Sequence, residues 1–80
     1  LWLGTGAGLP DASITSLASG GGDRLWAADE RGGLWACSLN RMRCAPAPLP
    51  ADGANVTDLA VDGPYLWLST FGRGVWRVRA

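Results

Sequence analysis

The sequence contains no histidine and no lysine. Without histidine, the chain has no imidazole to act as a general base near neutral pH or to bind a transition metal. Without lysine, it has no side-chain amine for a Schiff base with a carbonyl substrate. These absences remove several common kinds of catalytic site. We therefore expect no enzymatic activity, no cofactor and no metal.

Excess charge of one sign is also lacking, because seven arginines balance seven acidic residues. A balanced chain has no electrostatic reason to bind nucleic acid or to insert into an anionic membrane. No stretch approaches the ~20 apolar residues of a membrane helix, and no basic segment followed by an apolar run marks a signal peptide.

Eighty residues, 48% of them hydrophobic, are typical of one small globular domain. Since the chain opens directly in Leu1-Trp2-Leu3, without an initiator methionine, we interpret it as a piece of a longer protein.

Cysteine is scarce, and Cys37 and Cys44 are the only two. If a hairpin turns at Asn40-Arg41, these cysteines face each other on neighbouring strands, with Cα atoms about 4.5–5.5 Å apart, within reach of a disulfide. A disulfide implies an oxidising compartment, so we expect an extracytoplasmic location, periplasmic or secreted. A reduced, buried pair is the alternative. A metal site needs more ligands than two cysteines supply.

What the chain does contain is an internal repeat with a period of 40 to 42 residues. Five landmarks recur in the same order, which is too many for coincidence in so short a chain. They are Leu9-Pro10 with Leu49-Pro50, Ile14 with Val56, Leu25-Trp26 with Leu66-Trp67, Gly33 with Gly74, and Leu34-Trp35 with Val75-Trp76.

Each copy has the pattern of short strands, because β-branched and Leu-Trp segments alternate with Gly-rich or Asp-Gly turns. Four short strands in about 40 residues are typical of one blade of a β-propeller. The sequence predicts an all-β fold of about two blades, each a four-stranded antiparallel sheet, in a larger or oligomeric propeller. The expected strands are residues 14–19, 24–29, 33–39 and 42–49 in the first copy, and 55–61, 65–70 and 74–79 in the second.

Residues 1–5 are expected to form a further strand. Leu1 precedes Ile14 by only 13 residues, so this segment lies where the last strand of a preceding blade belongs. With the strands of a blade named A to D, the order becomes D-ABCD-ABC; a shortened blade or a deletion is the alternative. The predicted organisation is one propeller fragment, residues 1–80. It divides into an N-terminal strand and connection (1–13), a first blade repeat (14–50) and a second blade repeat without its last strand (51–80).

The repeat resembles a known family. In the two-component-regulator-type β-propeller repeat, the motifs GLP, ITSL, NLWIGT and GGLY follow one another. The corresponding residues here are Gly8-Leu9-Pro10, Ile14-Thr15-Ser16-Leu17, Asp23-Arg24-Leu25-Trp26 and Gly32-Gly33-Leu34-Trp35, and the resemblance covers residues 8–80. It implies a bacterial sensor or ligand-binding propeller on the extracytoplasmic side of a signalling protein, with ligands such as oligosaccharides.

The tryptophans have two interpretations. An indole face can stack on a sugar, but it also buries a large apolar area. Because Trp26, Trp35, Trp67 and Trp76 occupy equivalent places in the two copies, packing between blades explains them better than ligand binding. We expect these four to lie in the core, and Trp2 as well.

The turns offer the candidate ligand-binding residues. In a propeller, the connections between blades and the turns between second and third strands emerge on one face, which commonly holds the ligand. For each residue there, turn formation or solvation is the alternative. The candidates are Asp11, Asp29, Glu30, Arg31, Asp52, Asn55, Phe71 and Arg73.

These observations favour a non-catalytic binding or interaction module, with a ligand or partner at the rim formed by these turns. A structural, self-assembling propeller scaffold is the alternative, and a fragment of a glycosidase-like propeller enzyme is the third hypothesis. Two blades leave apolar sheet faces open, so the expected partners are further blades of the same protein or copies of this chain. A carbohydrate or a protein is the expected ligand, and neither nucleic acid nor membrane insertion is expected.

Overall fold

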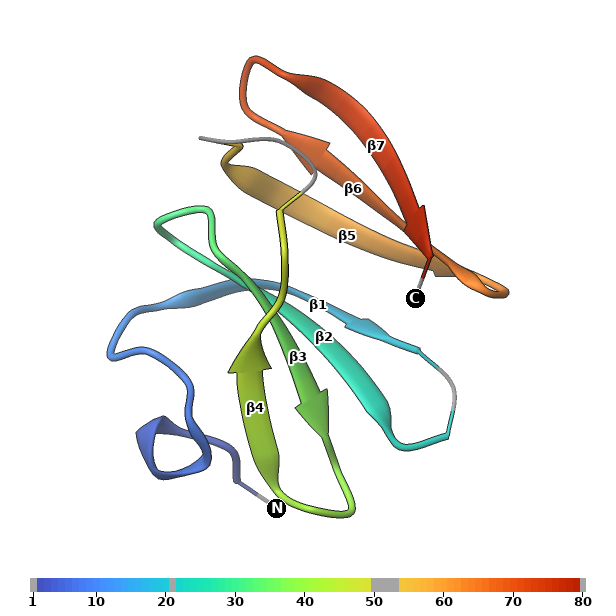
Figure 1. The fold of residues 1–80 in the computed structure, drawn as a ribbon. Coiled ribbons are helices and arrows are strands. Elements are labelled where there is room, and N and C mark those ends of the chain that lie inside the picture. Colours follow the sequence, from blue (N-terminus) through green and yellow to red (C-terminus); the bar gives the residue numbers. More distant parts are fainter. Residues whose placement is uncertain (1, 21, 50–53, 80) are drawn as a thin grey trace.

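The computed structural model describes residues 2–20, 22–49 and 54–79. In these ranges the chain forms one short 3-10 helix, Thr5–Ala7, and seven strands (Figure 1). The strands are β1 (Ile14–Ser19), β2 (Arg24–Asp29), β3 (Leu34–Ser38), β4 (Arg43–Pro46), β5 (Val56–Asp62), β6 (Tyr65–Thr70) and β7 (Gly74–Arg79). They make two antiparallel sheets, one of four strands in the order β1-β2-β3-β4 and one of three in the order β5-β6-β7. The all-β prediction is confirmed.

The two sheets repeat the same local structure. Trp26 pairs with Ala18 and Ala36, and its equivalent Trp67 pairs with Ala60 and Arg77 at the matching positions. A β-bulge interrupts the pairing near the start of the first strand in each sheet, between residues 14 and 16 in β1 and between 56 and 58 in β5. The repeat that the sequence shows is therefore a repeat of register as well.

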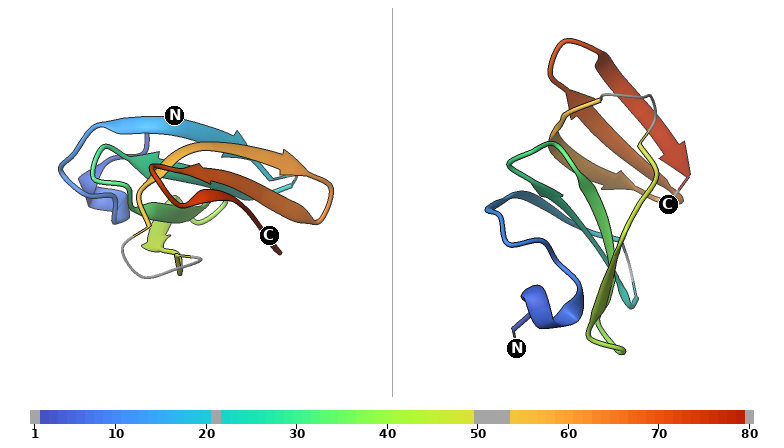
Figure 2. Two further views of the ribbon diagram at one scale, coloured as in Figure 1. Left: turned by 90° about the horizontal axis from the view of Figure 1, so that it is seen from above. Right: turned by 60° about the vertical axis from the view of Figure 1, so that its left-hand side comes forward.

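The hydrophobic core lies between the two sheets, and β1 and β5 run alongside each other (Figure 2). Since successive side chains of a strand point to opposite faces, Leu66 and Leu68 enter the core while Trp67 between them points away from it. The buried core residues are Trp26, Ala28, Leu34, Val56, Leu59, Leu66 and Leu68. Each sheet thus has one face against the other sheet and one face turned outward.

A polar contact joins the first strands of the two sheets. The Ser16 hydroxyl donates to Asp58 Oδ1 over 2.8 Å, and the Leu59 backbone N–H donates to Ser16 Oγ over 3.2 Å. The hydrogen bond from Ser16, followed by that from the Leu59 amide, lowers the pKa of the Asp58 carboxyl below its ordinary value of 3.8. Ser16 and Asp58 are equivalent positions of the repeat, each directly after the bulge.

The prediction of a strand at residues 1–5 is wrong for the residues that the structure describes. Residues 2–5 are not in a strand, Thr5–Ala7 form the 3-10 helix, and Leu1 lies outside the described residues. Three glycines between residues 4 and 8 disfavour an extended strand. Gly8 also has a φ of 110°, and a Cβ there would lie 2.3 Å from the Cys44 carbonyl oxygen, so this position requires glycine. The order D-ABCD-ABC therefore loses its first strand.

Other expectations differ in detail. The strand expected at residues 42–49 is the shorter β4, and it ends at Pro46, which has no N–H to donate to a sheet. Of the tryptophans expected in the core, only Trp26 is buried there. Trp35 is half-buried, and the exposed ones are Trp2, Trp67 and Trp76.

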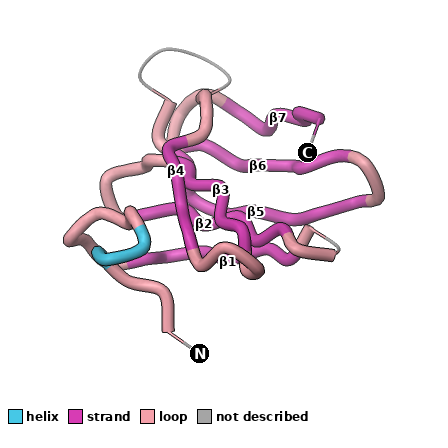
Figure 3. The backbone as a smooth tube through the Cα atoms, turned by 60° about the horizontal axis from the view of Figure 1, so that its bottom comes forward, coloured by secondary structure: helices cyan, strands magenta, loops and turns pink. Residues whose placement is uncertain are grey.

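The three-stranded sheet ends at β7 (Figure 3). β7 pairs with β6 along one edge, from Gly74 to Arg79. Its other edge has no strand partner among the described residues. In the same described ranges, no helix is long and apolar enough to cross a membrane.

Candidate functional site

The loops at one end of the two sheets are tied together through the backbone. This end includes the β2–β3 turn, the β6–β7 turn, and the segments that lead into β1 and β5 (Figure 1). The hydrogen bonds are Glu30 N–H to Ser13 O (2.8 Å), Val56 N–H to Gly32 O (3.1 Å) and Phe71 N–H to Asn55 O (2.9 Å). We call this end the turn rim, and its gathering of four loops agrees with the expectation from the sequence.

The β2–β3 turn reaches the second sheet at Gly32. This residue has a φ of 84°, and a Cβ there would lie 2.5 Å from the Asn55 Cα atom. A left-handed backbone conformation and a backbone neighbour at this distance both require glycine. The close approach allows the hydrogen bond from Val56 to Gly32, which fixes the turn of the first sheet against the start of β5.

Asp29 shapes the turn rim from inside. Its side chain is only 5% exposed. Oδ1 accepts hydrogen bonds from the Arg31 and Gly33 amides, at 2.8 and 3.0 Å, and Oδ2 accepts one from Trp35 Nε1 at 2.9 Å. Burial alone raises the pKa of this carboxyl, but the bond from Trp35 and those from Gly33 and Arg31 outweigh it, so the pKa lies below 3.8. Both carboxylate oxygens already accept hydrogen bonds from the protein, which favours a structural role for Asp29 over ligand binding.

The second sheet builds the equivalent turn without a carboxylate. Thr70 replaces Asp29, and its hydroxyl donates to Gly74 O over 2.8 Å. Trp76 Nε1 donates to the Arg73 carbonyl over 2.9 Å, where Trp35 donates to Asp29. The β6–β7 turn is therefore held by its own backbone, and its exposed side chains differ from those of the β2–β3 turn.

The remaining rim candidates face solvent. Phe71 is 78% exposed, which is a high fraction for a large apolar side chain. The Glu30 carboxylate accepts a hydrogen bond from the Ser13 amide over 3.2 Å, linking two loops. The other exposed candidates are Asp11, Arg31, Asn55 and Arg73, and Asp52 lies outside the described residues. The turn rim thus presents one aromatic ring with both cationic and acidic side chains on a hydrogen-bonded frame.

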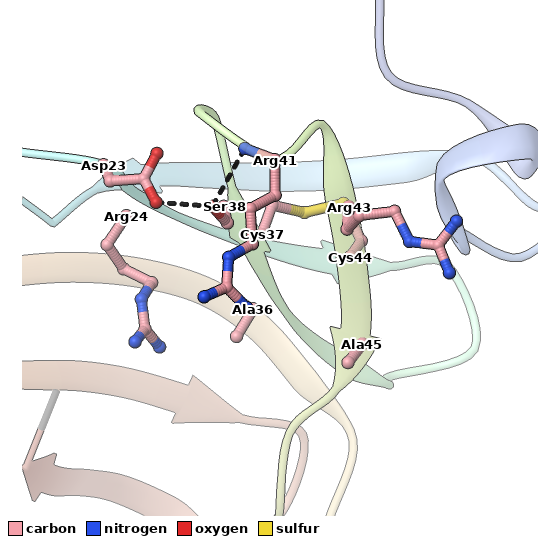
Figure 4. Close-up of a pocket in the computed structure, with 9 residues that line it drawn as sticks. All are labelled: Asp23, Arg24, Ala36, Cys37, Ser38, Arg41, Arg43, Cys44 and Ala45. Carbon is pink, nitrogen blue, oxygen red and sulfur yellow. Dashed lines mark hydrogen bonds between the residues drawn. A yellow bond between two sulfur atoms is a disulfide. The ribbon is translucent and has the colours of Figure 1, made fainter.

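A cavity of about 580 Å³ lies beside the β3–β4 hairpin (Figure 4). Arg24 and Arg41 extend to the same side of β3, whereas Arg43 extends away from them, toward the N-terminal segment. A guanidinium group can donate hydrogen bonds to a carboxylate or a phosphate. The lining residues are Asp23, Arg24, Ala36, Cys37, Ser38, Arg41, Arg43, Cys44 and Ala45.

Asp23 holds this hairpin in place. Its carboxylate accepts hydrogen bonds from the Ser38 hydroxyl and the Asn40 amide, and its carbonyl accepts one from Leu39 N–H over 2.9 Å. The bonds from Ser38 and Asn40, with a smaller contribution from nearby Arg41, lower the pKa of the Asp23 carboxyl below 3.8. Asp23, in the β1–β2 turn, thus also fixes the β3–β4 turn.

Cys37 and Cys44 pair on neighbouring strands and form a disulfide across this hairpin, which confirms the expected bridge. The Cα atoms are 4.0 Å apart, slightly closer than expected. Disulfides form and persist mainly in oxidising compartments.

Removing the disulfide is expected to destabilise the chain moderately. The bridged residues are seven positions apart. The chain-entropy relation gives roughly 2.5 kcal/mol for so short a loop. Urea unfolding of Cys37→Ser/Cys44→Ser against the oxidised wild type measures this loss. A loss above about 5 kcal/mol, beyond the range usual for one disulfide, would show that the bridge does more than close the hairpin.

The arginines of this cavity were not predicted as a site. The hairpin register pairs Ser38 with both Arg24 and Arg43, but Arg43 extends away from Arg24, so the register alone does not indicate the grouping of Arg24 with Arg41. In the described part of the chain, no three acidic, cysteine or histidine side chains gather as a metal site would require.

Comparison with known proteins adds no assignment. No family model matches the chain, and no significant similarity to a curated protein or to a solved structure was found.

Proposed function

We propose that this chain is a non-catalytic interaction module that binds its ligand at the turn rim. The observation that carries the proposal is the set of backbone hydrogen bonds that joins the four loops there. A fixed frame lets exposed side chains bind without a large ordering cost, since their backbone positions are already set. Phe71, at the tip of the β6–β7 turn, is the most exposed apolar member of this frame.

We further propose that the two sheets are consecutive blades of a β-propeller. Three features support this arrangement: the sheets pack face to face, their first strands lie side by side, and their registers repeat. In a propeller, the first strands surround the central axis and the turn rim forms one face of the ring. The resemblance of the repeat to sensor propellers points in the same direction.

The chemistry of the turn rim fits an oligosaccharide that carries acidic groups. An exposed aromatic ring can stack on the apolar face of a sugar. Arginines such as Arg31 and Arg73 can donate hydrogen bonds to carboxylates and hydroxyls of the same ligand. The lowered pKa values of Asp23, Asp29 and Asp58 mean that all three are ionised near neutral pH, and all three already accept hydrogen bonds within the protein.

A glycan array of neutral and acidic oligosaccharides tests this proposal. Phe71→Ala is expected to weaken binding of the best glycan about tenfold, because stacking of an aromatic ring contributes up to about 1.5 kcal/mol. Trp67→Ala is the control, since Trp67 is an exposed aromatic residue on the outward face of the second sheet and not at the turn rim, and it should bind like the wild type. Equal loss in both variants, or no glycan bound by the wild type, contradicts the proposal.

A second candidate function is that of a structural scaffold. The observation that favours it is the outward face of the three-stranded sheet, where Trp67 and Val75 are exposed side by side with other apolar groups. A scaffold would bind protein through this face rather than a small ligand through the turn rim.

A further inference from the structure

The outward face of β5, β6 and β7 carries an exposed apolar groove. The groove has a volume of about 170 Å³ and is lined by Asp58, Leu59, Ala60, Trp67, Leu68, Ser69 and Val75. Trp67 is 39% exposed and Val75 is 68% exposed. Exposed apolar side chains that gather in one place commonly mark a protein-binding surface. We call this surface the tail face.

The repeat shows what normally covers such a surface. The equivalents of Trp67 and Val75 in the first sheet are Trp26 and Leu34, which are only 6% and 3% exposed. Both belong to the core between the two sheets, where the second sheet covers them. The tail face is therefore the same surface as the covered one, repeated one sheet further along.

The opposite end of the chain presents the complementary surface. Leu59 and Leu66, from the second sheet, are 8% and 0% exposed because they pack against the first sheet. Their equivalents Leu17 and Leu25 lie on the outward face of the first sheet, where Leu17 is 61% exposed. We call this surface the head face. Each exposed face thus repeats one side of the contact that the two sheets already make.

Polar groups distinguish the ways in which two copies can meet. Inside the chain, the Leu59 amide donates to the side-chain oxygen of Ser16. When a head face repeats this contact on a tail face, the Leu17 amide meets the Asp58 carboxylate, which is a stronger acceptor than a hydroxyl. Two tail faces brought together would instead place two Asp58 carboxylates side by side, and like charges oppose such a contact.

We propose that the tail face of one copy binds the head face of a second copy of this chain. The contact is heterologous, so repetition gives a closed ring or an extended stack rather than a two-fold dimer. Arg77 borders the surface, with its guanidinium 4.1 Å above the centre of the Tyr65 ring. The contact uses sheet faces and not the turn rim, so its presence or absence leaves the glycan-binding proposal unaffected.

Sedimentation velocity across a concentration series tests the association. The wild type is expected to form species larger than a monomer as concentration rises. Leu17→Arg blocks the head face and Val75→Arg blocks the tail face, and each is expected to raise the dissociation constant at least about tenfold, since a buried, unpaired charge costs far more than the 1.4 kcal/mol of one decade. Asn40→Arg, at an exposed turn outside both faces, should associate like the wild type.

Mixing the two blocked variants gives the decisive result. Leu17→Arg keeps an intact tail face and Val75→Arg keeps an intact head face, so the mixture should form a 1:1 dimer and nothing larger. Circular dichroism of each variant alone confirms that it is folded. A wild type that stays monomeric up to the highest soluble concentration overturns the proposal. Variants that fail to form the mixed dimer overturn it too, and disruption by Val75→Arg alone would indicate a two-fold contact instead.

Discussion

Replacing Asp29 with alanine is expected to lower the free energy of unfolding by about 3–5 kcal/mol, because three donors lose a charged acceptor in a buried turn. Those donors are the Arg31 and Gly33 amides and the Trp35 indole. Removing an exposed side chain that serves only to bind a ligand would change the free energy of unfolding little. Urea-induced unfolding, followed by tryptophan fluorescence, measures the difference.

The variant Asp29→Asn separates the contribution of the hydrogen bonds to Oδ1 from that of the bond to Oδ2. The amide oxygen of asparagine can keep the bonds to the two backbone amides, but its NH₂ group then faces Trp35 Nε1, which is also a donor. We expect a loss about half that of the alanine variant. Trp35→Phe removes the same bond from the other side, so the double variant Asp29→Asn/Trp35→Phe should lose less than the sum of the single losses. Additive losses would show that the indole and the carboxylate do not interact.

Asp29 also makes the stability dependent on pH. Its pKa in the folded chain lies below the ordinary value of 3.8, so its contribution is full above that value and is lost as the pH falls through the folded-state pKa. Asp23 and Asp58 have lowered pKa values and act in the same direction. The wild type should therefore lose stability as the pH falls below about 4, and Asp29→Asn should lose less over the same interval. An equal loss would exclude Asp29 as a contributor.

The second large effect is expected at Gly32. Gly32→Ala should destabilise the chain by about 3–5 kcal/mol, because it combines an unfavourable positive φ with a collision against the backbone of Asn55, directly before β5. Gly72→Ala is the matched control. Gly72, in the β6–β7 turn, has a φ of 79°, close to the 84° of Gly32, but a Cβ there would meet no atom within 4 Å. The control should lose only about 1–2 kcal/mol, the cost of the left-handed conformation.

The difference between these two glycine variants measures the contact between the sheets at the turn rim. Thermal unfolding of both variants beside the wild type gives that difference directly. Equal losses would mean that the β2–β3 turn moves aside without cost, and the turn rim would then be less rigid than its hydrogen bonds indicate.

Much of the fold could be predicted because the sequence states it twice. The expected strands at 14–19, 24–29, 65–70 and 74–79 match β1, β2, β6 and β7 at both ends. Residues 33–39 and 55–61 match β3 and β5 within one residue. The prediction for the N-terminal segment was wrong because it rested on the strand-forming residues Leu1-Trp2-Leu3 alone. A strand also needs a partner strand, and this segment has no equivalent in the repeat from which a partner could be inferred.

The candidate site could be predicted only in part. Loop connectivity was sufficient to place Glu30, Asn55 and Phe71 at one end of the sheets. It did not reveal that Asp29 is saturated by the protein, because one of its donors, Trp35, lies six residues away on the next strand. An aspartate that ends a strand before a Gly-Gly turn was a signal for such local bonding. The exposure of the equivalent tryptophans could not be predicted from the sequence, because it depends on which sheet covers which face.

In the part of the chain that the structure describes, the edge of β7 that faces away from β6 has no strand partner. A free strand edge is a template for uncontrolled pairing with other chains, and charged side chains on that strand oppose it. Arg77 and Arg79 alternate along β7 and lie near the Tyr65 ring. When two such edges approach, their positive charges repel, which disfavours growth of fibrils along the hydrogen-bonding direction. In the self-association that we propose, this repulsion favours contact through the sheet faces over amyloid-like pairing of strand edges.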